Sequence, residues 1–226
     1  MQHLIWKLKS HTVTKKNRVL DAQKTAVKGQ KLVIQIKDVS LYLKEKILKP
    51  MKELLNFPYR SQRDNYYNPS GSCNVTSIAM CLLRLGIRGN GEYVQLEDEC
   101  YARCLDRGWS RHEAVGLQNL AESYLGIKDD FISNGTLDDI RSAIDAGIPC
   151  VLHGYFTRFG HIIVAKGYDE DGLLVNDPWG EWHRSGYDTS VSGEGLHYSN
   201  HLIASKCSPE SEQNPRDIWL HRIYKQ

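Results

Sequence analysis

Several features that would assign this 226-residue chain to a specialised class are missing from its sequence. It has no uninterrupted apolar run of about 18 residues, so no transmembrane helix is expected. Its first residues, MQHLIWKLKSHTVTKK, mix apolar residues with lysines and lack the continuous apolar stretch of a secretory signal. We therefore expect the protein to be cytoplasmic as synthesised, and any action at a cell wall to follow non-classical release or lysis.

The cysteine pattern excludes two further classes. The six cysteines are irregularly spaced and include no CxxC pair, which argues against a disulfide scaffold and against a zinc ribbon. We expect most of them to be buried as small apolar residues and expect no metal or other cofactor. Hydrophobic residues make up 41% of the chain and charged residues 25%; because such a composition is ordinary for globular proteins, disorder is not expected for most of the length.

Charge is distributed unevenly along the chain. The first 56 residues hold 13 Lys and Arg against 4 Asp and Glu, whereas the remainder holds 16 against 23. This change in net charge predicts two modules, over residues 1–55 and 56–226. Alternating apolar residues such as Leu32, Ile34 and Ile36 predict a small basic β-barrel for the first. Its charge suits a polyanion such as an acidic cell-wall polymer or nucleic acid, although the lysines can also serve solubility alone.

The second module has helical periodicity first and short apolar strands later, which predicts an α+β domain. Helices are expected over residues 74–85, 96–106, 113–125 and 137–146, and strands within 148–156, 161–169 and 172–180. Thr136, followed three residues later by Asp139, is expected to cap the last helix.

Cys73 is the strongest candidate nucleophile. It follows Ser-Gly-Ser and stands where the first predicted helix begins. The positive end of the helix dipole lowers the pKa of a thiol there, and the thiolate is the reactive form. The alternative is a buried structural cysteine, the commoner fate of this residue type.

His161 and Asp177 form the candidate base and its orienting group. His161 opens one strand of a predicted hairpin whose turn is the Asp-Glu-Asp-Gly at 169–172, and Asp177 ends the other strand. Counting outward from the turn places the two residues opposite each other or nearly so, on the same side of the sheet. A carboxylate beside an imidazole fixes the tautomer and supports the imidazolium. The alternative is a surface histidine with an incidental acidic neighbour.

Gln62 lies in the loop that precedes Cys73. Its amide can donate to an oxyanion, together with the backbone N–H of Cys73 at the helix start. On its own a loop glutamine carries no functional meaning, so this role depends on the other three residues.

The order Gln, Cys, His, Asp, with the strings FPYRSQRDN, SGSCNVTSIAMCL, AGIPCVLHGY, GHIIVAKGY and LLVNDPWG, resembles the C39-like peptidases, which have a papain-like fold. The resemblance covers about residues 56–206. It implies that Cys73 is the nucleophile, His161 the base, Asp177 its partner and Gln62 the oxyanion donor. The family usually has Gly after the cysteine, whereas Asn74 stands here and either adds a polar contact or narrows the site. More weakly, residues 1–55 resemble the SH3-like modules that accompany such peptidases.

These observations together predict a cysteine hydrolase that cleaves peptide or amide bonds. A small basic module joined to a thiol hydrolase is typical of wall-degrading lysins, so the preferred substrate is the peptide part of bacterial peptidoglycan. Two alternatives stay open. One is a peptidase that processes a leader or a protein, and the other is a non-catalytic binding module that keeps the papain-like cleft.

Overall fold

The structure is a computed structural model that describes residues 51–208 and 217–226. The barrel predicted for residues 1–55 falls outside these ranges apart from its last five residues, so the module and its boundary stay predictions. Those five residues join the described domain. Strand β1 (Lys52–Glu53) pairs with β4 (His161–Tyr168), and Leu54 is buried in the core.

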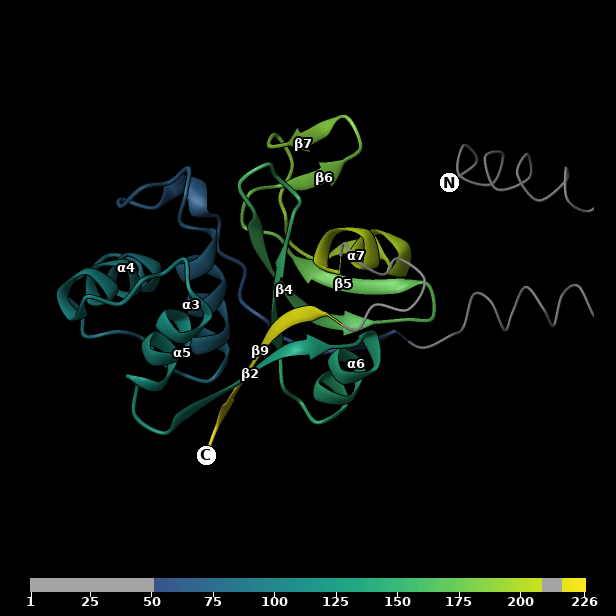
Figure 1. The fold of residues 1–226 in the computed structure, drawn as a ribbon. Helices are drawn as coiled ribbons and strands as arrows, with labels where there is room; N and C mark the ends of the chain where they lie inside the picture. Colours follow the sequence, from purple (N-terminus) through teal and green to yellow (C-terminus); the bar gives the residue numbers. More distant parts are fainter. Residues whose placement is uncertain (1–50, 209–216) are drawn as a thin grey trace, which may run out of the picture. The chain divides into compact units, whose positions relative to one another are not determined.

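An antiparallel sheet with strands of different lengths forms the centre of the domain. In the described residues its strand order is β2-β9-β3-β4-β5-β8, with β1 pairing on β4. A separate hairpin, β6 (Glu181–His183) and β7 (Gly186–Asp188), projects beyond it (Figure 1). The remaining strands are β2 (Ile127–Gly135), β3 (Cys150–Gly154), β5 (Gly172–Asn176), β8 (Leu196–Ser199) and β9 (Ile218–Lys225).

Helices cover both faces of the sheet (Figure 1). One side carries α3 (Cys73–Arg84), α4 (Leu96–Arg107) and α5 (Ala114–Glu122), and the other carries α6 (Leu137–Asp145) and α7 (Asn200–Cys207). The prediction of an α+β domain is therefore confirmed. Within the described ranges, no helix is both long and apolar enough to cross a lipid bilayer.

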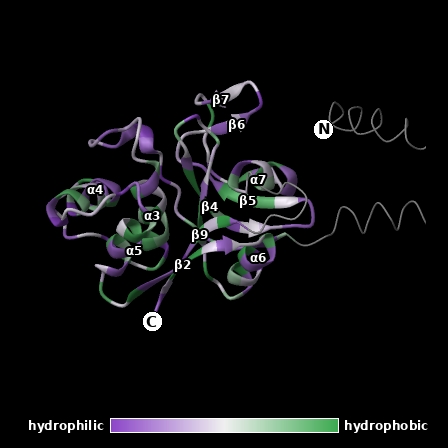
Figure 2. Cartoon of the chain, in the orientation of Figure 1, coloured by the Kyte–Doolittle hydropathy of each residue, from purple (hydrophilic) through white to green (hydrophobic). Residues whose placement is uncertain are grey.

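Helix α3 is the innermost helix. Every residue from Asn74 to Leu82 is buried, including the polar Thr76 and Ser77. In Figure 2 the ribbons of α4 and α6 carry both hydrophilic and hydrophobic residues. The sequence suggested one apolar face, but α3 packs between β4 on one side and α4 and α5 on the other, so it is enclosed all round. Its first residue, Cys73, is therefore held rigidly.

Two elements, a helix and the strand after it, differ from those predicted from the sequence. The helix predicted over 113–125 ends at Glu122, and Leu125 is almost fully exposed. Strand β2 then occupies 127–135, where the charged stretch KDD hides the alternation expected of a strand. It pairs with β9, which lies at the far end of the chain, so the pairing has no local signal.

The capping box at the start of α6 can be tested by mutation. Thr136 Oγ1 accepts from the Asp139 backbone N–H at 3.1 Å, and Asp139 Oδ2 accepts from the Thr136 backbone N–H at 2.8 Å. We expect Thr136→Ala to lower the free energy of unfolding by about 1 kcal/mol, because the Asp139 N–H loses its acceptor. Urea denaturation measures this, with Thr136→Ser, which keeps the hydroxyl, as the control. Equal stability of all three proteins would contradict the capping box.

Candidate active site

Cys73 is the first residue of α3 and is partly exposed, whereas the other five cysteines are buried. Its position depends on the polar contacts of the preceding loop. The Asn65 side-chain amide donates to Ser72 Oγ and to Thr76 Oγ1, both at 2.9 Å. These bonds tie the loop to the first turn of the helix, so the sulfur lies at the positive end of the helix dipole.

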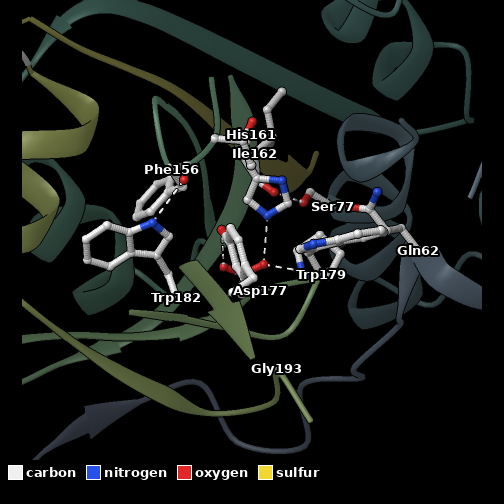
Figure 3. Close-up of polar contacts among 12 residues, drawn as sticks. Gln62, Ser77, Phe156, His161, Ile162, Asp177, Trp179, Trp182 and Gly193 are labelled. Carbon is white, nitrogen blue, oxygen red and sulfur yellow. Dashed lines mark hydrogen bonds and ion pairs between the residues drawn. The ribbon is translucent and has the colours of Figure 1, made fainter. Parts of the chain in front are cut away.

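His161 and Asp177 come together at one edge of the β4–β5 pair. Nε2 of His161 lies 2.7 Å from Asp177 Oδ1 (Figure 3). The register pairs Val164 with Asn176, so the two residues are diagonal neighbours on one face of the sheet and are not directly opposed. The sequence prediction that they share a face and lie close together agrees with this geometry.

Four hydrogen bonds saturate the carboxylate of Asp177, which is fully buried. Oδ1 accepts from His161 and from the backbone N–H of Trp179 at 3.0 Å. Oδ2 accepts from the hydroxyls of Tyr187 at 2.9 Å and Tyr198 at 3.0 Å. Burial and the charge of Asp177 raise the pKa of both phenols, so they stay protonated donors. The carboxylate is consequently fixed in one orientation toward His161.

The main chain of Asp177 is held as tightly as its side chain. Its N–H donates to Gly193 O at 2.8 Å, and its carbonyl accepts from the Tyr59 hydroxyl at 3.2 Å. A Cβ at position 193 would lie only 1.8 Å from Asp177 O, so this close approach requires glycine. Tyr59, Tyr187, Tyr198 and Gly193 were not identified from the sequence, because nothing near them in the chain marks them as neighbours of Asp177.

The protonation states of Cys73 and His161 follow from their mutual contact. Burial opposes ionisation of the thiol, but the charge of His161, a hydrogen bond from its ring and the backbone N–H of Ile162 lower the pKa of Cys73 below its usual value. Burial also opposes the imidazolium, but Asp177 and Cys73 raise the pKa of His161 above its usual value. Since Nε2 is bound to Asp177, Nδ1 is the nitrogen left for the sulfur. The arrangement favours a thiolate–imidazolium pair.

Gln62 is buried in a short 3₁₀ helix, η1 (Gln62–Asp64), and lines the same cleft as Cys73. Its backbone N–H donates to Pro178 O and its side-chain amide donates to Pro69 O, both at 2.9 Å. A primary amide has two N–H groups, so one is left for another acceptor. The structure thus brings Gln62, Cys73 and His161 to one cleft, with Asp177 buried behind His161. Their catalytic roles stay predictions.

The cleft has a volume of about 670 Å³ and lies between the start of α3 and the sheet. Asn74 forms part of its wall. The amide of Asn74 donates to Arg111 O at 2.7 Å, and its Oδ1 accepts from the Val75 N–H at 2.9 Å. The guanidinium of Arg111 also contacts Gly71 O and stacks on the ring of Tyr101. Asn74 is therefore a fixed element that joins the helix start to the 111 loop.

Comparisons with known proteins agree with this architecture. The profile of the peptidase C39-like family matches residues 54–199. A Bacillus anthracis protein assigned as a C39-like peptidase has a crystal structure 16% identical to the chain, with a TM-score of 0.52, covering 78% of this chain and 98% of that one. This likeness shows a shared fold. A double-glycine-motif protease of an AMS/PCAT transporter, in complex with its leader peptide, is 18% identical with a TM-score of 0.37, covering 66% and 83%. Comparison with curated proteins finds no match.

The ion pair leads to a prediction for thiol reactivity. We expect iodoacetamide to alkylate Cys73 selectively below the usual thiol pKa of about 8.5, because His161 stabilises the thiolate. His161→Ala removes the cation but leaves the burial, so the pH profile shifts upward and labelling at about pH 7 falls at least about tenfold. Peptide mass spectrometry against time measures both.

The other cysteines serve as internal controls in the same digest. Burial raises the pKa of thiols such as Cys81 and Cys150, so they are expected to react slowly in both proteins. Six cysteines alkylated at similar slow rates in the wild type would contradict the pair.

Proposed function

The chain belongs to the peptidase C39-like family, and from this membership and the geometry at Cys73 we propose that it hydrolyses peptide or amide bonds. The observation that carries the proposal is the contact between the partly exposed thiol of Cys73 and the imidazole of His161. The other ring nitrogen of His161 is bound to Asp177, whose carboxylate oxygens have all their hydrogen-bonding positions occupied. These are the parts of an activated nucleophile: an attacking group, a base and a group that orients the base.

The reaction begins when the Cys73 thiolate adds to the carbonyl carbon of the scissile bond. Negative charge develops on the carbonyl oxygen, where the backbone N–H of Cys73 and the free N–H of Gln62 stabilise it. The imidazolium of His161 donates its Nδ1 proton to the leaving nitrogen. The C–N bond breaks, the amine departs and a thioester remains on Cys73.

Water completes the cycle. Neutral His161 takes a proton from water, the hydroxide formed adds to the thioester carbon, and the C–S bond breaks to release the carboxylic acid and the thiolate. Asp177 holds the ring so that Nδ1 faces the sulfur. The hydroxyls of Tyr187 and Tyr198 and the Trp179 N–H keep the carboxylate in place through both steps.

The proposed preferred substrate is the peptide part of bacterial peptidoglycan. Two features support it. The first 56 residues are strongly basic, which favours association with acidic wall polymers. The cleft wall also carries Arg111, and a guanidinium suits the carboxylates of wall peptides.

Purified bacterial sacculi and a soluble peptide library test the substrate and the chemistry together. We expect the wild type to release new amino groups from sacculi, and Cys73→Ala to lose at least about a thousandfold of this activity, because the nucleophile is gone. Cys104→Ala, which removes a buried thiol in α4, is the matched control and is expected to retain activity.

Each other outcome identifies an alternative. Cleavage of soluble peptides without release from sacculi would replace the wall substrate by leader or protein processing. No cleavage of either substrate, with equal behaviour of the wild type and Cys73→Ala, would contradict the hydrolase and favour a binding module.

A further inference from the structure

A second carboxylate–histidine pair, Asp129 and His221, is bound to His153, which lines the same cleft. The proposed chemistry does not use this pair. Asp129, His221 and His153 stand on β2, β9 and β3, which are adjacent strands. His221 pairs with Phe131 on one side and with Val151 on the other. Asp129 and His153 are each two residues from those partners. Because side chains alternate along a strand, all three lie on one face.

The three side chains form a continuous row. Asp129 Oδ2 lies 2.7 Å from His221 Nδ1, and His221 Nε2 lies 3.0 Å from His153 Nε2. Asp129 and His221 are buried, whereas His153 is partly exposed. A row of this kind does not converge on one point, and no metal-binding group of three or more such side chains occurs in the described ranges. The row is therefore a chain of hydrogen bonds that runs from the buried Asp129 to the partly exposed His153.

His153 is the end of the row that meets the cleft. It lines the cleft together with Cys73, His161 and Trp219. Its partner across β3 and β4 is Ile162, whose backbone N–H binds the Cys73 sulfur. His153 thus lies on β3, the strand beside the one whose Ile162 N–H contacts the Cys73 sulfur.

The contacts of the row determine which atom His153 offers to the cleft. Its Nε2 is bound to His221, so Nδ1 is the nitrogen left for a ligand. When His221 is neutral, its Nε2 accepts from His153 and Nδ1 is an acceptor. When His221 is an imidazolium paired with Asp129, it donates to His153 and Nδ1–H is a donor. Burial lowers the pKa of His153 to about 3, so the ring itself stays neutral.

Aromatic packing fixes the plane of this ring. Phe131 and Trp219 each contact it edge-on, with centroid separations of 6.3 and 6.1 Å, and His221 stacks on it at 5.1 Å. A neutral, rigid ring with one free nitrogen suits a polar, uncharged ligand group. The main-chain amide of an extended peptide supplies both an N–H and a C=O, so it matches Nδ1 in either protonation state of His221.

Resting on the proposed function, we propose that His153 binds the main chain of the peptide substrate through Nδ1, and that His221 and Asp129 are positioning residues that orient its ring. The substrate would then run from Cys73 along β4 and β3 toward Trp219. The sequence does not suggest this, because Asp129 and His221 are 92 positions apart.

Reversible peptide aldehydes test the contact without a known substrate. They add to the Cys73 thiolate, and their length can be varied at a constant reactive group. The probes are acetyl-glycinal and acetyl-Ala-Ala-glycinal, with inhibition constants obtained from protection of Cys73 against iodoacetamide. The ratio of the two constants measures what the added main chain contributes and cancels the reactivity of the thiol.

We expect the longer probe to bind the wild type more tightly and His153→Phe, which keeps a ring but no nitrogen, to lose about tenfold of that gain, as for one hydrogen bond. His153→Gln retains a hydrogen-bonding group and is expected to keep part of it. Asp129→Asn is expected to lose part of the gain with an unchanged alkylation rate. A purely structural role of the row would instead change the unfolding free energy and leave the ratio alone.

A measurement on the wild type tests the contact even where a variant fails to fold. Replacing each amide of the longer probe in turn by an ester is expected to weaken binding at one position in the wild type and not in His153→Phe. An unchanged ratio in His153→Phe, or no ester effect in the wild type, would overturn the contact and leave the hydrolase intact. Failure of both aldehydes to bind the wild type would overturn the hydrolase and the contact with it.

Discussion

The hydrogen bond between His161 Nε2 and Asp177 Oδ1 is the interaction on which the rest of the site depends. It sets the direction of the imidazole, and through the ring it sets the charge of Cys73. A buried carboxylate carries a large desolvation cost unless its oxygens are bound. Here two tyrosine hydroxyls and a backbone N–H occupy the remaining positions. The surrounding shell, contributed by the turn after β5, β7 and β8, is therefore required for the ion pair to exist.

The two halves of the domain supply different parts of the chemistry. The enclosed helix α3 fixes the sulfur and its N–H, and the sheet fixes the base and its partner. The cleft lies where the start of the helix meets the strand ends, so the reacting groups are held by rigid elements. The row from Asp129 to His153 repeats the carboxylate–imidazole arrangement and meets the cleft at His153. In the proposed reaction the first pair activates a thiol, and in the proposed substrate contact the second orients a ring toward the main chain of the peptide.

Local patterns were enough to predict much of this. The α6 cap, the start of α3 near Cys73 and the hairpin that joins His161 to Asp177 each depend on residues close in sequence, and the structure contains them. Long-range pairings could not be predicted in this way. The β2–β9 pairing joins a charged stretch to the end of the chain, and the tyrosines on Asp177 come from separate segments. Their positions follow from tertiary packing, which single-sequence periodicity does not encode.

The charge on His161 tests the central claim most directly. Nitrogen-15 NMR of histidine-labelled protein distinguishes an imidazolium, with both ring nitrogens protonated, from a neutral ring. The account predicts that His161 in the wild type stays an imidazolium at about pH 7.5, above the usual histidine pKa of about 6.5, and loses its proton at lower pH in Cys73→Ala. A neutral His161 ring in the wild type at that pH would contradict it.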